Sequence, residues 1–89
     1  MNLQYIRAKV LFKLARRRKW GESHTPIDLA LKGFKKSDIS EAKNALANLI
    51  KINWVLVKPT FSGQHVSLNP SHAQEIKEEI RKLLRIDFW

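Results

Sequence analysis

The stretch of residues 37–69 reads SDISEAKNALANLIKINWVLVKPTFSGQHVSLN and contains two contrasting patterns of apolar residues. Its first part places apolar residues on one side at about 100° per residue, which predicts an amphipathic helix over 38–52. Its second part predicts a β-hairpin over 54–68, because two β-rich runs, WVLV and HVSL, flank the turn-forming segment KPTFSGQ. Asn53 tolerates positive φ and separates the helix from the hairpin. We expect the hairpin loop to be longer than a two-residue turn. Phe61 is expected to fold back onto the body of the domain, and the alternative is that it inserts at a partner surface.

The side of this helix opposite its apolar stripe is small and polar. It carries Ser40, Lys43, Asn44, Ala47, Asn48 and Lys51. Small residues allow close approach to a groove of nucleic acid, and asparagine and lysine can meet base edges and phosphates. An ordinary solvated face is the alternative, because patterns of this kind are degenerate.

A short helix is predicted over 26–32, directly before this stretch. Thr25 suits the N-cap, Pro26 suits the first helical position, and Gly33 suits the left-handed residue that follows a helix. Only the five residues GFKKS then separate the two helices. This spacing predicts a helix-turn-helix.

Two longer helices are predicted at the ends of the sequence, over 2–19 and 71–87. The first has two apolar rows, which predicts packing against two neighbours, one of which could belong to a second subunit. A third row on the same helix holds Lys9, Lys13 and Arg16. A homodimer built through these two terminal helices is therefore expected. We expect Asn69 or Ser71 to cap the last helix.

The charge of the chain is concentrated near its start. The net charge is +9, and the first twenty residues hold seven basic residues and no acidic one. Such a surplus attracts polyanions, whether nucleic acid, anionic lipid or an acidic protein, and does not choose among them. The run RRRK at 16–19 could simply favour the C-terminal end of the helix dipole, or it could contact phosphates. A basic, acid-free helix is also typical of membrane surfaces.

Several classes of protein are disfavoured by the composition. Eighty-nine residues predict one domain over 1–89, and the absence of cysteine excludes disulfides and cysteine-based zinc sites. No apolar run approaches about 20 residues and no secretory signal is evident, so we expect a cytoplasmic or nucleoid-associated protein. The three histidines lack metal-ligand spacing and no glycine-rich phosphate loop is present. We therefore expect no enzymatic activity, no cofactor, no metal and no small-molecule ligand.

The order of predicted elements resembles the winged helix-turn-helix superfamily of DNA-binding domains: mainly α, with a small β-hairpin as the wing. The likeness lies in ISEAKNALANLIK, NWV, KPTFSGQ and HVSLNP, and extends over residues 25–89, with residues 1–20 as the first helix. Three departures stand out. Asn53 replaces a usual glycine, the wing has few cations beyond Lys58, and ESHTP predicts no convincing strand between the first two helices.

The resemblance implies binding of double-stranded DNA by a small transcription regulator or chromatin-associated factor. The helix at 38–52 would enter the major groove and the wing would touch the backbone or minor groove. The implied contacts comprise Ser40, Lys43, Asn44 and Ala47 near bases; Lys35, Lys36, Lys51 and Lys58 at phosphates; and Thr25 and Gln64 as further polar groups. A winged-helix module that binds protein, or a binder of structured RNA, are the alternatives.

Overall fold

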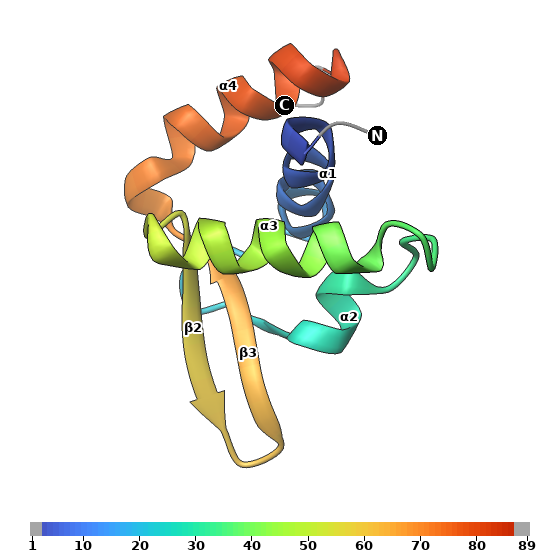
Figure 1. The fold of residues 1–89 in the computed structure, drawn as a ribbon. Coiled ribbons are helices and arrows are strands. Elements are labelled where there is room, and N and C mark those ends of the chain that lie inside the picture. The colour runs from blue at the N-terminus through green and yellow to red at the C-terminus, as the bar shows by residue number, and fades with distance from the viewer. Residues whose placement is uncertain (1–2, 87–89) are drawn as a thin grey trace.

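Helix α1 (Leu3–Arg16) runs through the middle of the fold and carries much of its core. The structure is a computed structural model that describes residues 3–86. The other elements are β1 (Thr25–Pro26), α2 (Ile27–Leu31), α3 (Ile39–Lys51), β2 (Val55–Thr60), β3 (Gly63–Leu68), the 3-10 helix η1 (Pro70–His72) and α4 (Ala73–Leu84). In Figure 1, α3 crosses in front of α1, α4 lies above them, and the β2–β3 hairpin projects downward.

The apolar rows of α1 explain its central position. Its buried side chains are Ile6, Ala8, Val10, Leu11, Leu14 and Ala15. The helix packs against both α3 and α4, and also contacts α2. The two predicted rows are therefore covered within one chain, apart from Leu3 at the start of the helix, which is 58% exposed.

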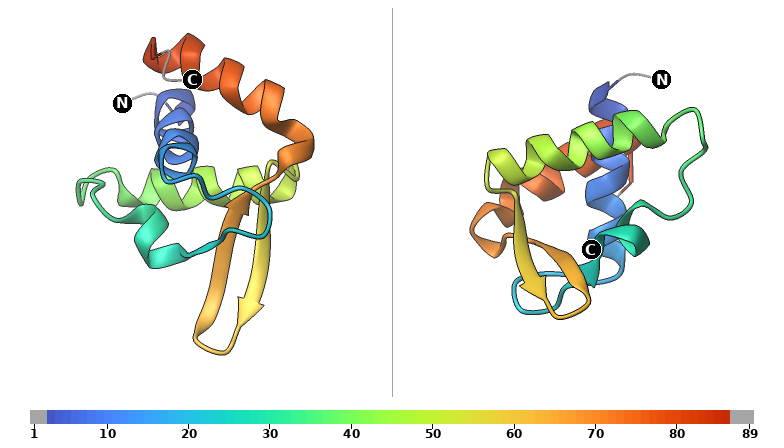
Figure 2. Two further views of the ribbon diagram at one scale, coloured as in Figure 1. Left: turned by 180° about the vertical axis from the view of Figure 1, so that it is seen from behind. Right: turned by 60° about the horizontal axis from the view of Figure 1, so that its bottom comes forward.

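The three strands form an antiparallel sheet in the order β1-β3-β2. The hairpin register runs from Val55 opposite Leu68 to Thr60 opposite Gly63. Val66 and Leu68 are buried at the base of the hairpin, whereas the residues at its tip are exposed. The sheet thus anchors the hairpin by one end and leaves the other end projecting (Figure 2).

The predicted arrangement of helices followed by a hairpin is confirmed, and so are several of its boundaries. Asn53 and Gly33 have φ angles of 66° and 97°, as their positions at helix ends required. Asn69 caps the turn before α4, since its Oδ1 accepts a hydrogen bond from the backbone N–H of Ser71 at 3.0 Å. The last helix itself begins later than predicted, at Ala73, because η1 precedes it. It also ends earlier than predicted, at Leu84, because Arg85 adopts a left-handed φ of 55°.

Four local predictions were wrong. Helix α1 ends at Arg16 rather than at residue 19, and Arg18 then adopts a φ of 56°. Thr25 is not an N-cap but part of β1, a strand that the sequence did not predict, where it pairs with Val66. The hairpin tip is a two-residue turn at 61–62 rather than a long loop. Phe61 at this tip is fully exposed instead of folded back. Residue 87, at the end of the predicted last helix, lies outside the described residues.

Candidate nucleic-acid interface and a second basic surface

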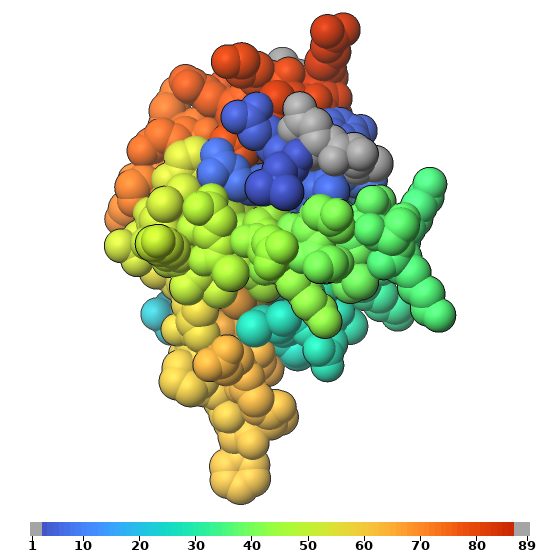
Figure 3. Space-filling model, in the orientation of Figure 1, coloured from blue at the N-terminus to red at the C-terminus, as the bar shows by residue number. Residues whose placement is uncertain are grey.

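The polar face of α3 points away from the core, as the sequence predicted. Its buried side, with Ala42, Ala45, Leu46 and Leu49, belongs to the core that α1 shares. The exposed residues are Ser40, Lys43, Asn44, Ala47, Asn48 and Lys51. They contain no acidic side chain. Figure 3 shows α3 lying across one face of the molecule, above the hairpin. The result is a neutral-to-basic ridge with small residues at its middle.

The hairpin stands beside this ridge and has an apolar tip. Phe61 is the most exposed large hydrophobic residue described, and Leu56 and Val57 on β2 are also exposed. Lys58 has an acidic neighbour, because Nζ lies 3.6 Å from Oε2 of Glu22. The hairpin therefore offers an aromatic ring and one partly neutralised cation.

The structure brings together some of the predicted contact residues and separates others. Lys35 and Lys36 are exposed in the turn between α2 and α3, and Lys51 is exposed at the opposite end of α3. Gln64 is exposed on the hairpin. Thr25 is only 4% exposed, so its hydroxyl does not lie on the surface. Apart from Thr25, the predicted set follows α3, the turn before it and the hairpin.

Arg7 on α1 links α3 to α4, and no pattern in the sequence indicates these contacts. Its Nε donates to Oε2 of Glu79 on α4 at 2.8 Å, its Nη2 pairs with Oε1, and its Nη1 donates to Oδ1 of Asn48 on α3 at 3.0 Å. The guanidinium lies 5.2 Å from the ring centroid of Trp54. The hydrogen bonding that Arg7 donates to the Glu79 carboxylate raises the pKa of Arg7. One side chain of α1 thus fixes an exposed residue of α3 relative to α4.

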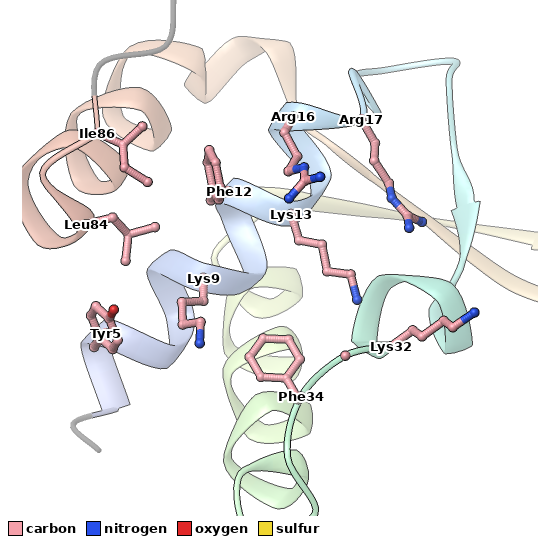
Figure 4. A pocket seen from close by; sticks show the side chains of 11 residues that line it. Tyr5, Lys9, Phe12, Lys13, Arg16, Arg17, Lys32, Phe34, Leu84 and Ile86 are labelled. Carbon is pink, nitrogen blue, oxygen red and sulfur yellow. The ribbon is translucent and has the colours of Figure 1, made fainter.

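A pocket of about 390 Å³ lies on the outer face of α1 (Figure 4). Its lining comes from α1, from the residues after α2 and from the end of α4. It includes Lys9, Lys13, Arg16, Arg17 and Lys32, together with the rings of Tyr5, Phe12 and Phe34. Among the described lining residues there is no carboxylate. The predicted row of cations on the first helix is therefore part of a concave basic surface, hereafter the α1 pocket.

Lys13 is the most confined cation of the α1 pocket. Its Nζ is buried and has no hydrogen-bond partner among the described residues, although it lies 5.8 Å from the ring centroid of Phe34. Burial lowers the pKa of Lys13, and neighbouring cations, with Arg17 the largest contributor, lower it further. This ammonium is held where a positive charge is disfavoured.

Two histidines that are distant in sequence meet beside the hairpin. Nδ1 of His24 lies 2.8 Å from Nδ1 of His65, with the rings edge to face. One ring must donate and the other accept, so the contact requires at least one neutral imidazole. The pKa of His24 is lowered, mainly because the ring is desolvated and secondly because the charge of Lys58 is nearby. No group of three or more potential metal ligands occurs within residues 3–86.

The polar face of α3 and the α1 pocket lie on different sides of the molecule. In Figure 1, α3 is in front of α1, whereas from behind, and in the view into the pocket, α1 is in front of α3 (Figures 2 and 4). The five cations of the α1 pocket therefore lie away from the face that the sequence predicted to meet bases.

Comparisons with known protein families, with curated proteins and with solved structures yield no match to this chain. No helix within the described residues has the length and apolar character needed to cross a membrane.

Proposed function

We propose that this protein is a winged helix-turn-helix domain that binds double-stranded DNA through α3 and the β2–β3 hairpin. The observation that carries the proposal is the acid-free face of α3, which is exposed beside a projecting hairpin. Such a helix has the width to enter the major groove, where each base pair presents a distinct pattern of donors and acceptors. The order β1-β3-β2 and the placement of α2 and α3 support this fold assignment.

Each exposed residue has a role that follows from its chemistry. Asn44 can form a bidentate pair with adenine, and Ser40 can bond to several bases. Ala47 lets the backbone of α3 approach the groove or touch a thymine methyl. Lys36 at one end of α3 and Lys51 at the other are spaced to reach the phosphates that flank the groove.

Phe61 gives the hairpin a role other than electrostatic attraction. Wings that bind by charge need cations, and Lys58 is the sole basic residue of β2 and β3. An exposed aromatic ring at a narrow tip is suited to apolar contact with the sugars of the minor groove or to insertion at a base step. The hairpin then contributes shape rather than charge.

Selection of binding sites from a library of random duplexes tests the proposal. We expect a short enriched motif, and we expect Asn44→Ala to relax the preference at one base pair by about 1–3 kcal/mol. The matched control is Gln74→Ala, which removes an exposed amide from α4 and should leave the motif unchanged. Failure to enrich any sequence, together with the same affinity for duplex RNA, would favour recognition of structured RNA by shape.

A protein-binding module is the second candidate, and the exposed apolar residues of the hairpin favour it. Leu56, Val57 and Phe61 are exposed on one narrow element. Under this alternative, duplex DNA binds weakly near physiological salt, and Phe61→Ser abolishes the capture of a protein partner.

A homodimer through α1 and α4 is a further proposal. Light scattering that gives a monomer at high micromolar concentration would exclude it.

A further inference from the structure

The α1 pocket has the size and charge of a site for a small anion, and DNA binding through α3 leaves it unused. Its volume of about 390 Å³ falls within the range of about 300–1,000 Å³ that is usual for small-molecule sites. Its described lining brings together five cationic side chains and no carboxylate. A ligand that this lining stabilises must be negatively charged.

The ammonium of Lys13 adds a specific requirement for an anion. It is buried, lacks a hydrogen-bond partner among the described residues and has cations as neighbours. A buried charge without a partner costs free energy, and a bound anion would remove this cost by supplying both the opposite charge and acceptor oxygens. Phosphate oxygens suit this position because they accept charge-assisted hydrogen bonds from lysine and arginine, and both Lys13 and Arg16 line the pocket.

The aromatic rings of the pocket narrow the class of anion. Lys9 Nζ lies 5.8 Å from the ring centroids of both Tyr5 and Phe34, so cations and rings alternate along the lining. This alternation is how proteins hold phosphate-linked bases: the rings stack on the base and the cations pair with the phosphate. Inorganic phosphate would use the cations and leave the rings without a role.

We propose that the α1 pocket binds a nucleotide, with its phosphates at Lys13 and Arg16 and its base against Tyr5 and Phe34. The same chemistry is present in a free nucleotide and in an unpaired nucleotide of a single strand. Because the pocket lies on a different side from the exposed face of α3, this site does not depend on the duplex interface and can be tested separately.

Titration of the full chain with ADP, adenosine, pyrophosphate and a single-stranded oligoadenylate tests the proposal. By calorimetry, ADP should bind at least about tenfold more tightly than adenosine or pyrophosphate, since only ADP uses both the cations and the rings. In 15N-labelled protein, ADP should shift the amide resonance of Gly33, which lines the pocket, and leave that of Asn44 on α3 in place. Tighter binding of the oligomer than of ADP would identify a single strand as the source, and the reverse would identify a free nucleotide.

Two variants with equal loss of charge provide the control. Lys13→Gln with Arg16→Gln should weaken ADP binding about tenfold or more, as expected for losing charge-assisted bonds. Lys43→Gln with Lys51→Gln removes two cations from α3 and should change ADP affinity less than about twofold. Equal weakening in both variants would overturn the proposal, because it would mean attraction by net charge alone.

Phe34→Leu separates the role of the ring from that of the cations. Leucine preserves an apolar side chain where Phe34 packs against the core, so the fold should be retained. This variant should lose affinity for ADP and keep its affinity for pyrophosphate. If pyrophosphate binds the natural protein as tightly as ADP, the pocket is only a site for inorganic anions and the proposal is wrong.

Discussion

Replacing Arg7 by methionine tests whether one side chain holds α1, α3 and α4 together. Methionine preserves much of the aliphatic stem and removes the guanidinium that pairs with Glu79 and Asn48. Hydrogen bonds to charged groups contribute about 1.5–3 kcal/mol. Breaking a fully buried pair costs about 3–5 kcal/mol. The side chains of Arg7 and Glu79 are 25% and 15% exposed, which places this pair below that upper range.

We therefore expect Arg7→Met to lower the free energy of unfolding by about 2 kcal/mol. For a domain of this size the midpoint should fall by about 8–16 °C, as followed by circular dichroism. Much of the loss comes from the carboxylate left without a partner, so adding Glu79→Gln should recover about 1 kcal/mol. Arg17→Met removes an exposed cation from the end of α1 and should change stability by less than about 0.5 kcal/mol.

Two results would show that Arg7 does not hold the three helices together. A loss below about 0.5 kcal/mol in Arg7→Met would mean that the pair behaves as a solvated surface contact. No recovery in the double variant would mean that Glu79 does not need its partner.

Three further variants test the α1 pocket, the contact between two histidines and the hairpin tip. Lys13→Met should raise the free energy of unfolding by about 0.5–2 kcal/mol at pH 7, since it removes a confined charge. Because the pKa of Lys13 is lowered, the extra stability of this variant should shrink as the pH rises from that pKa toward the usual lysine value. A urea titration that shows a lower free energy of unfolding for Lys13→Met at pH 7 would contradict this prediction. The lowered pKa of His24 means that the unfolded chain takes up its proton first. Stability should therefore decline as the pH falls below about 6.5, the ordinary histidine value, and His24→Gln should reduce this decline in thermal melts between pH 7.5 and 5. If the stability of His24→Gln declines with falling pH as much as that of the natural protein, the contact between His24 and His65 is not the cause of the decline. Phe61→Ser should leave the melting temperature within about 2 °C because the ring is fully exposed, yet weaken duplex binding severalfold in fluorescence anisotropy. A large fall in melting temperature would show that the ring packs against the domain.

The face of α3 could be predicted from the sequence because a helical period is local information. The apolar residues between Ile39 and Ile50 repeat at helical spacing and form one side of the helix. Whichever neighbour that side packs against, the residues on the opposite side lie on the surface. The hairpin was predictable for a similar reason, since a proline and a glycine interrupt two β-rich runs. The exposed ring of Phe61 was missed because burial of an aromatic residue is the more frequent outcome. The tight turn at 61–62 leaves this ring no core to join.

The features that the sequence did not predict depend on pairs that are remote along the chain. Strand β1 is two residues long and exists through its pairing with β3, about forty positions later. The contact of Arg7 with Glu79 and that of His24 with His65 likewise require the folded chain. The row of cations on α1, Lys9, Lys13 and Arg16, is visible in the sequence. The rings and the residues after α2 that turn this row into a pocket come from separate segments.

If α3 and its flanking turn bind the phosphates of a DNA duplex, the affinity for DNA must fall as the salt concentration rises, and their lysines must account for much of that fall. Each phosphate contact contributes about 0.9 to the slope of log affinity against log salt concentration. Replacing Lys36, Lys43 and Lys51 by glutamine should reduce this slope by about 2–3. Replacing Lys9, Arg16 and Lys32 removes the same charge from the α1 pocket and should change the slope by less than about 1. A larger reduction of the slope in the pocket variant would instead show that the DNA binds on the outer face of α1 and not along α3.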